Sequence, residues 1–255
     1  MPTALITGGT AGIGATFARQ LAARGDDLVL VARDADRLAT YAAELRSSYG
    51  VEVETLAADL ADREQTQRVA DRLEDPDRPI EVLINNAGFG LSSNLLNPDT
   101  AVDERALDVM CRAVLVLGGA AARAMKARGH GRILNTSSTA GFVAMGHYSA
   151  IKAWVTSYSE SLATQLRGTG VTVTALCPGW VHTEFHDRAN INASSIPSWA
   201  WIDADRLVAD ALVDLDRGRV ISVPTPLWKT AITVAKFLPR SVIRTISARL
   251  TSRRH

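Results

Sequence analysis

The chain has 255 residues, of which 47% are hydrophobic, and its formal net charge is +1. This length can bury one large core, and the near-neutral charge argues against a dedicated nucleic-acid binder. The two cysteines, Cys111 and Cys177, both lie in apolar sequence, so we expect no disulfide framework and a reducing compartment. The sequence shows no secretory signal pattern and no run of about 20 apolar residues, which predicts a cytoplasmic location.

The first strand-to-helix turn carries the strongest local signal. Residues 4–6 are apolar, and a glycine-rich segment then opens an alanine-rich helical pattern that reaches Arg24. Gly8, Gly12 and Gly14 are spaced so that the backbone can turn sharply and approach a pyrophosphate at the helix start. The loop is predicted to hold a nucleotide, the alternative being that these glycines only relieve steric crowding.

Apolar runs and helical patterns alternate along the chain, which is typical of parallel strands covered on both faces. Strands are expected at residues 27–32, 51–57, 80–84, 132–136, 171–176 and 219–223. Helices are expected at about 35–48, from about 62, at 101–127, from 148 and at 203–216. The predicted fold class is therefore α/β, a doubly wound parallel sheet with helices on both faces.

Polar side chains follow two of these strands. Arg33 comes directly after the second strand, where an arginine favours the 2′-phosphate of NADP. The alternative is that Arg33 is a solvated residue before the helix cap Asp34. Asp59 follows the third strand, and it either accepts a hydrogen bond from the adenine amino group or starts the next helix.

The later strand ends add further candidates. Segment 85–88, Asn-Asn-Ala-Gly, suits a close approach of backbone and cofactor with amides joining neighbouring strands, or else is a simple turn. Tyr148 and Lys152 are four residues apart and so share one helical face, where an ammonium favours the phenolate and lets the pair exchange protons. Ser138 can hydrogen-bond the same substrate oxygen. A solvated Tyr/Lys pair is the alternative.

Residues 178–202 combine a rigid Pro-Gly pair with a long aperiodic loop. Pro178 and Gly179 suit a wall beside a flat ring, and Thr183 can reach a carboxamide or phosphate. Loop 184–202 is predicted to be a lid over an apolar substrate, because it contains Phe185, Trp199 and Trp201. Its tryptophans can instead anchor the loop. No metal site is expected, because the order of His182, Glu184 and His186 does not match a metalloprotease helix.

Taken together, these motifs stand in one order: Thr7-Gly8-x-x-x-Gly12-x-Gly14, Asn85-Asn86-Ala87-Gly88, Ser138, Tyr148-x-x-x-Lys152 and Pro178-Gly179. The chain resembles the classical short-chain dehydrogenase/reductase family from residue 3 to about 223. The resemblance implies a seven-stranded parallel Rossmann sheet in one catalytic domain, residues 1–225, an NAD(P) cofactor, and hydride transfer between nicotinamide and a carbonyl or alcohol. It also implies a homo-oligomer. Arg33 favours NADP over NAD as that cofactor.

The resemblance assigns roles to individual residues. Tyr148 would be the general acid/base, Lys152 would bind the nicotinamide ribose and assist Tyr148, and Ser138 would orient the substrate oxygen. The cofactor contacts would be Gly8, Thr10, Gly12, Ile13, Gly14, Arg33, Asp59, Leu60, Asn86, Ala87, Gly88, Tyr148, Lys152, Pro178, Gly179, Val181 and Thr183. The expected function is an NADPH-preferring oxidoreductase acting on a lipophilic carbonyl or alcohol.

Two departures from the family pattern leave alternatives open. Met110 stands where many members have an asparagine that holds a water for proton relay, and a thioether cannot replace an amide there. This motivates a second hypothesis, a nucleotide-sensing or scaffolding protein with weak catalysis. The step from serine to tyrosine is also a few residues shorter than in many members, so Ser137 remains an alternative to Ser138.

Residues 226–255 form a basic extension beyond the recognised core. Residues 217–255 contain nine basic side chains and no acidic one. Beyond Pro239, apolar residues recur at helical spacing with arginines interleaved, which predicts a basic amphipathic helix. Such a helix either packs on the domain or on a partner subunit, or lies on an anionic membrane surface.

Overall fold

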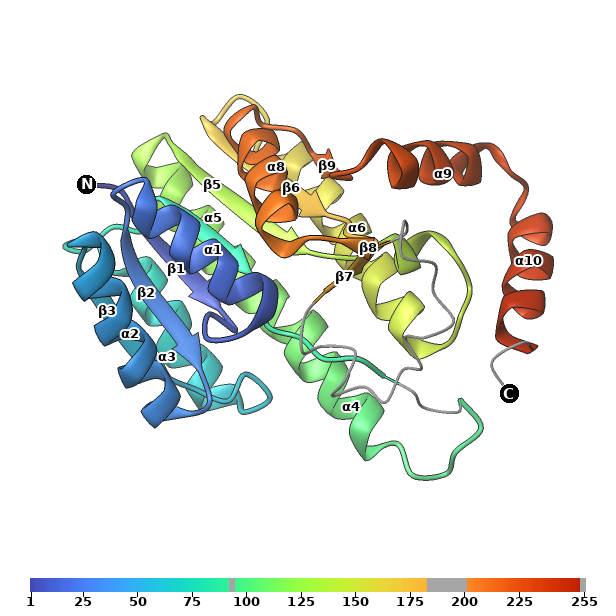
Figure 1. The fold of residues 1–255 in the computed structure, drawn as a ribbon, viewed down its shortest axis with the longest axis horizontal. Coiled ribbons are helices and arrows are strands. Elements are labelled where there is room, and N and C mark those ends of the chain that lie inside the picture. The colour runs from blue at the N-terminus through green and yellow to red at the C-terminus, as the bar shows by residue number, and fades with distance from the viewer. Residues whose placement is uncertain (92–94, 183–200, 253–255) are drawn as a thin grey trace.

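A computed structural model of the chain describes residues 1–91, 95–182 and 201–252. At its centre lies a seven-stranded sheet in the order β3-β2-β1-β4-β5-β6-β9, and all of its neighbouring strands are parallel (Figure 1). The strands are β1 (Thr3–Thr7), β2 (Asp27–Ala32), β3 (Val53–Ala57), β4 (Val82–Asn85), β5 (Gly131–Thr136), β6 (Val171–Leu176) and β9 (Ile221–Ser222). The predicted doubly wound α/β sheet is confirmed.

The chain between the strands forms helices. They are α1 (Gly12–Ala23), α2 (Ala35–Tyr49), α3 (Arg63–Glu74), α4 (Ala101–Leu107), α5 (Ala113–Arg128), α6 (His147–Gln165), α8 (Ala204–Asp216), α9 (Pro226–Phe237) and α10 (Arg240–Ser252). A short 3₁₀ helix, η2 (Thr139–Phe142), follows β5, and two short strands, β7 (Trp180–Val181) and β8 (Trp201–Ile202), pair with each other.

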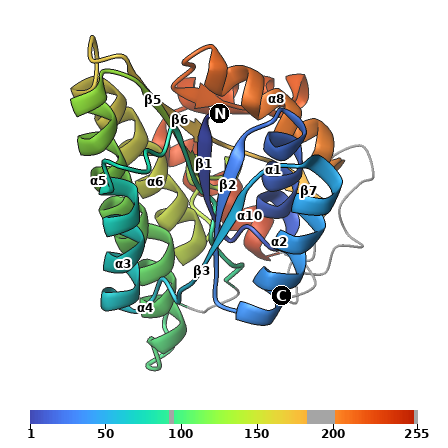
Figure 2. The same ribbon diagram turned by 90° about the vertical axis from the view of Figure 1, so that its left-hand side faces the viewer.

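Successive strand residues face opposite layers, as the pleat of a strand requires. In β1, Ile6 packs into a cluster with α1, α2 and α8, whereas Leu5 packs into a second cluster with α3, α5 and the end of α6. Figure 2 shows the sheet edge-on between these two helical layers. Because both faces are covered, the continuous apolar runs of the strands are explained.

The strand order reverses between β1 and β4, because β1 pairs with β2 on one side and with β4 on the other. In open parallel sheets, ligands bind outside the carboxyl ends of the strands at such a reversal. The glycine-rich turn after β1 and the segment after β4 therefore meet at this edge of the sheet.

Some boundaries differ from the sequence prediction. The helix predicted at 101–127 is three pieces, because a π-helical turn, Asp108–Arg112, separates α4 from α5. The final strand is two residues long instead of five. Most of the predicted lid, 184–202, lies outside the described residues, and its last two residues are the strand β8.

Candidate active site

The turn between β1 and α1 has a backbone that only glycine fits at two positions. Gly8 has a positive φ angle of 65°, in the left-handed region that favours glycine. A Cβ atom on Gly14 would lie 2.1 Å from the carbonyl oxygen of Gly8, far inside van der Waals contact. The turn is therefore as tight as the glycine spacing predicts.

The start of α1 suits an anion. Its N-cap is Ala11, which makes no side-chain hydrogen bond, and its first turn holds no acidic residue. By contrast, Asp34, Asp62 and Asp203 cap α2, α3 and α8 through hydrogen bonds to backbone N–H groups. Uncapped N–H groups at the positive end of a helix dipole favour a phosphate. The glycine turn and this helix start together fit the pyrophosphate of a dinucleotide, and we call them the cradle.

Thr7 and Asn86 hold the cradle against the end of β4. The Thr7 hydroxyl oxygen accepts hydrogen bonds from the backbone N–H groups of Asn86 (2.9 Å) and Ala87 (3.0 Å). The Asn86 amide nitrogen donates to the carbonyl oxygens of Thr7 (3.2 Å) and Gly8 (3.4 Å). Asn86, Ala87 and Gly88 thus lie beside the cradle and shape it, and their contacts with the cofactor stay predictions.

Amide side chains also join the strands below this edge, as predicted. Asn85 Nδ2 donates to Asn135 Oδ1 (2.9 Å), which links β4 to β5. Asn135 Nδ2 in turn donates to Ser159 Oγ (2.9 Å) on α6. This buried chain of hydrogen bonds fixes the catalytic helix candidate α6 to the sheet.

Two arginines lie near the cradle at the end of β2. Arg33 is exposed directly after the strand, and Asp34 accepts a hydrogen bond from the backbone N–H of Arg37 as the predicted helix cap (3.0 Å). The Arg37 side chain donates from Nε to the carbonyl oxygen of Thr10 (3.0 Å). Sequence analysis missed Arg37, although its place in the first turn of α2 brings it back over the strand end.

Asp59 is tied to α4 and does not start α3. Its carboxylate accepts hydrogen bonds from Arg105 (2.7 and 3.0 Å) and from the backbone N–H of Ala61 (3.0 Å). Burial opposes ionisation of Asp59, but these hydrogen bonds outweigh it and hold its pKa below the ordinary value. The cap of α3 is Asp62, which accepts from Gln65 (2.8 Å), so the helix-start alternative for Asp59 is wrong.

The three predicted catalytic side chains are brought together. Lys152 Nζ lies 5.5 Å from the ring centroid of Tyr148 and donates to the carbonyl oxygen of Thr136 at the end of β5 (2.9 Å). The Tyr148 phenol is hydrogen-bonded with Ser138, whose hydroxyl also accepts from the backbone N–H of Ala140 (3.1 Å). Their catalytic roles stay predictions, but the geometry on which those roles depend is present.

Burial sets the protonation states of this pair. It raises the pKa of Tyr148 well above the ordinary value, an effect that the hydrogen bond with Ser138 opposes. Burial also lowers the pKa of Lys152 from 10.5 to about 8. At pH 7 the phenol is therefore neutral and the lysine is charged. The Lys152 ammonium lies close to the Tyr148 ring, as the sequence predicts, but desolvation outweighs its preference for the phenolate in this state, so Tyr148 is poised to donate a proton.

Ser137, the alternative to Ser138, has its hydroxyl committed elsewhere. Its side chain points to α6, where Oγ donates to the carbonyl oxygen of Lys152 (2.7 Å) and contacts Thr156 Oγ1 (2.7 Å). The residue is 1% exposed. Ser137 thus supports α6 from behind, and the geometry favours Ser138 over Ser137 as the residue beside Tyr148.

Met110 lies in the π-helical turn beneath the site. It is almost fully buried and packs in a cluster that includes Ile151 and Tyr148. In the same turn, Arg112 pairs with Asp108 (2.6 Å) and donates to the carbonyl oxygen of Leu60 (3.2 Å). The side chain of Leu60 belongs to the core, so only a small part of this residue is available to a cofactor.

The segment after β6 closes the other side of the site. The carbonyl oxygen of Pro178 accepts from Thr139 in η2 (2.9 Å), and a Cβ atom on Gly179 would lie 2.2 Å from the Trp228 indole nitrogen. Val181 packs in one cluster with Ile13 of the cradle. Thr183 lies outside the described residues.

At the end of the predicted lid, Trp201 contacts the segment around β7. Trp201 belongs to β8, and the ring of His182 stacks on it at 4.4 Å between centroids. The other two members of the rejected metal trio, Glu184 and His186, lie outside the described residues, as do Phe185 and Trp199.

The basic extension packs on the segment that carries the site. Ser247 of α10 accepts a hydrogen bond from the backbone N–H of Ala144, between Ser138 and Tyr148 (3.0 Å). Ile232 and Ile243 are buried, one in each tail helix. Of the alternatives for the tail, packing on the domain is therefore observed for one side of each helix.

A further pair near the site was missed. His147 Nδ1 lies 2.6 Å from Asp103 Oδ1, and both side chains are largely buried. His147 directly precedes Tyr148, so the contact ties the start of α6 to the start of α4. The two residues are 44 positions apart, and no local pattern relates them.

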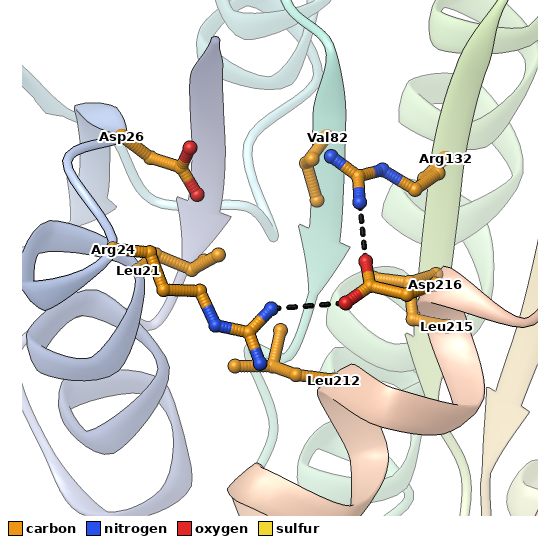
Figure 3. Close-up of a pocket in the computed structure, with 8 residues that line it drawn as sticks. All are labelled: Leu21, Arg24, Asp26, Val82, Arg132, Leu212, Leu215 and Asp216. Carbon is orange, nitrogen blue, oxygen red and sulfur yellow. Dashed lines mark hydrogen bonds and ion pairs between the residues drawn. The ribbon is translucent and has the colours of Figure 1, made fainter. Parts of the chain in front are cut away.

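A cavity of about 270 Å³ lies at the opposite, amino-terminal edge of the sheet (Figure 3). Asp216 binds Arg24 (3.1 Å) and Arg132 across this cavity, and Asp26 points toward it. None of the predicted site residues lines it. This cavity is therefore separate from the candidate active site at the carboxyl edge.

Comparison with known proteins agrees with this geometry. A family model described as short chain dehydrogenase matches residues 2–193. A protein named for a ketoacyl reductase of the granaticin polyketide synthase, from Streptomyces violaceoruber, is 37% identical over 208 residues, which cover 76% of this chain and 73% of that protein.

Solved structures give the same result. A short-chain dehydrogenase from Sphingobium yanoikuyae in complex with NADPH superimposes with a TM-score of 0.85 and 37% identity, covering 92% of this chain and 94% of that one. A bulky-bulky ketone specific alcohol dehydrogenase from Comamonas testosteroni has a TM-score of 0.79 and 32% identity, covering 94% and 96%. The chain belongs to the short-chain dehydrogenase family, and it is an NAD(P)-dependent oxidoreductase of alcohols and carbonyl compounds.

Proposed function

We propose that the protein is an NADPH-preferring oxidoreductase for lipophilic carbonyl compounds and alcohols. The observation that carries this proposal is the convergence of Ser138, Tyr148 and Lys152 beside an uncapped glycine cradle. The residues fit a dinucleotide, because the tight turn at Gly8 and Gly14 leads directly into a helix start whose N–H groups no side chain caps.

The cradle would hold the dinucleotide, which when bound would supply the hydride that reduces the carbonyl carbon. Tyr148 gives its phenolic proton to the carbonyl oxygen, which becomes the alcohol hydroxyl. Ser138 holds that oxygen by a hydrogen bond, and the charged Lys152 stabilises the phenolate left on Tyr148. In alcohol oxidation the same proton returns to Tyr148.

Arg33 supports the preference for NADPH. It is exposed at the end of β2, where the adenosine ribose is read in this fold, and it can make charge-assisted hydrogen bonds to a 2′-phosphate. Arg37 brings a second guanidinium to the same turn. The related Sphingobium enzyme was solved with NADPH, which is consistent with this proposal.

Aromatic residues near the site support a lipophilic substrate. Trp180 of β7 contacts Trp201 of β8, and Trp228 lies against Gly179. Two relatives are named for ketoacyl and bulky ketone substrates, and these names support a ketone over a small aldehyde as the substrate proposed here. We therefore infer a ketone with apolar substituents, or the corresponding secondary alcohol.

The remaining proposals concern assembly and location. Leu107, Leu115 and Trp154 are 44%, 50% and 36% exposed on α4, α5 and α6, and such apolar side chains suit a contact between subunits of a homo-oligomer. Neither Cys111 nor Cys177 forms a disulfide in the part of the chain that the structure describes, which favours the reducing cytoplasm. No helix among the described residues has the length and hydrophobicity needed to cross a membrane.

The experiment is Tyr148→Phe, assayed by NADPH absorbance with a panel of ketones. We expect turnover to fall by about 10²- to 10⁴-fold with nearly unchanged NADPH affinity, because only the proton donor is lost. Tyr158→Phe is the matched control, since Tyr158 lies on the same helix and its hydroxyl bonds only a backbone oxygen of Leu115 in the described part of the chain. Near-native turnover of Tyr148→Phe would contradict the proposal.

The same assay also tests the second hypothesis, which Met110 motivates. A nucleotide sensor or scaffold would bind NADPH but reduce none of the ketones, in the wild type as well as in Tyr148→Phe. The two hypotheses are therefore distinguished by wild-type turnover alone, without reference to any variant.

A further inference from the structure

Helix α9 exposes an apolar face that the active site does not use. Its inner face is buried, with Ile232 5% exposed and Trp228 packed against Gly179. On the outer side, Leu227, Val234 and Phe237 are 46%, 54% and 85% exposed. Three large apolar side chains exposed on one short helix form a contiguous feature, unlike the scattered apolar residues of an ordinary surface.

Helical geometry shows how this face is arranged. At about 100° per residue, Leu227 and Val234 fall on one stripe, and Phe237 lies on the outward arc beside it. Thr230 and Thr233, both exposed, occupy the rest of that arc. Lys229 is exposed on the flank, between the outward arc and the buried face. An uncharged outer arc with a cation at its border is the pattern of a helix that lies in a membrane interface.

The segment that forms α9 and α10 carries charge of one sign. Residues 226–255 contain seven basic side chains and no acidic one. Among them, Arg240 and Arg244 are exposed in α10, shortly after Phe237. A second copy of this chain would bring the same positive surface against itself in a two-fold contact, which is unfavourable. The complementary partner is an extended anionic surface.

We propose that α9 docks on an anionic lipid bilayer. Phe237, Val234 and Leu227 enter the interface, while Lys229, Arg240 and Arg244 bind lipid headgroups. The inner face of the same helix holds the wall of the active site through Trp228, so docking brings the site close to the lipid. Figure 1 shows α9 and α10 extending beyond the β9 edge of the sheet.

The test is cosedimentation of the full-length protein with vesicles. Vesicles of phosphatidylcholine mixed with phosphatidylserine are compared with phosphatidylcholine alone, at low and at high salt. We expect binding to the anionic vesicles that weakens as salt rises, and little binding to the neutral ones. Absence of binding to anionic vesicles at low salt would overturn the proposal.

Two groups of variants then test the assigned residues. Val234→Ser with Phe237→Ser should lower the vesicle association constant at least tenfold, and Lys229→Gln or Arg240→Gln about fivefold each. Val213→Ser, on α8 and 41% exposed, is the matched control and should bind like the wild type. Binding that persists unchanged in Val234→Ser with Phe237→Ser would contradict the docking face.

Folding and catalysis are followed in parallel. Because Val234 and Phe237 are exposed, their replacement should leave the melting temperature and the reduction of a water-soluble ketone unchanged. If the double variant instead becomes a smaller species by light scattering, the face is a subunit contact and the proposal is wrong. A wild type that binds vesicles but reduces no ketone would overturn the proposed function and leave the docking proposal intact.

Discussion

The cofactor side and the substrate side of the site are held together in different ways. The cradle is fixed by backbone geometry and by hydrogen bonds among Thr7, Gly8 and Asn86, which lie at the ends of two adjacent strands. The substrate side depends on side chains from the end of the chain, such as Trp228 under Gly179 and Ser247 on the loop before α6. We expect a site built this way to have a rigid cofactor half, and a substrate half that can vary with the tail.

The largest expected effect is on the cradle, from Gly14→Ala. The new methyl group would lie 2.1 Å from the carbonyl oxygen of Gly8 and 2.5 Å from the Asn86 amide, both of which are held in place. We expect a loss of more than about 3 kcal/mol in the free energy of unfolding, together with loss of NADPH binding. Chemical denaturation and a fluorescence titration measure the two effects.

Gly119→Ala is the matched control, because its methyl group would contact only the end of the Arg123 side chain, at 3.4 Å. Within α5, alanine is a better helix former than glycine by about 1 kcal/mol, so this variant should be neutral or slightly more stable. Equal stability of the two variants would show that the cradle can relax, and the contrast between a rigid and a variable half would then fail.

Lys152→Met is expected to separate stability from function. Burial lowers the pKa of Lys152 from 10.5 to about 8, which corresponds to about 3 kcal/mol of destabilisation at pH 7. Removing the ammonium should therefore stabilise the cofactor-free protein by up to about 3 kcal/mol. Turnover should fall at least about 100-fold, because Tyr148 loses the charge that stabilises its phenolate.

The stability gained by Lys152→Met should depend on pH. Between pH 8 and 10.5 the unfolded lysine binds a proton that the folded one has released, so wild-type stability rises with pH in this window. The advantage of Lys152→Met should accordingly be complete below about pH 8 and disappear as pH approaches 10.5. Denaturation of both proteins across this range measures it, and a pH-independent difference would contradict the assigned cause.

Local sequence signals predicted the parts of the site that local physics determines. The glycine turn, the cap at Asp34 and the Tyr148/Lys152 face follow from spacing along one turn or one helix. The alternation of Leu5 and Ile6 between two cores follows from the pleat of a strand. These features need no knowledge of distant parts of the chain.

The other features of the site depend on contacts between residues far apart in the sequence. Asp59 resembled a helix cap, but Arg105, 46 residues later, takes its carboxylate. Ser137 and Ser138 are equivalent by type, and only the strand's alternation and the position of α6 separate them. Met110 lies in a π-helical turn that helical propensity does not predict, and its side chain packs against residues of α6 that are distant in the sequence.

Replacing Arg33 tests whether the cofactor half also determines the preference for NADPH over NADH. Arg33→Ala should weaken NADPH about tenfold or more and leave NADH nearly unchanged, because only NADPH carries the 2′-phosphate. Titrations of both cofactors measure this. Arg68→Ala, an exposed arginine on α3, is the control and should change neither affinity. An equal loss of affinity for NADPH and NADH would show that Arg33 shapes the turn and does not bind the 2′-phosphate.

The smallest expected effect lies on the substrate half, in the pair of Asp103 and His147. Their 2.6 Å contact joins α4 to the residue before Tyr148, so it positions the tyrosine without touching the reacting atoms. Asp103→Ala and His147→Ala should each lower kcat/KM about fivefold, and the double variant should be no worse than either single one, because a coupling of about 1 kcal/mol is lost once. NADPH affinity should stay unchanged, since neither residue belongs to the cradle. Additive losses in the double-mutant cycle would show that the two side chains act separately, and a fall in NADPH affinity would show that the two halves of the site are mechanically linked.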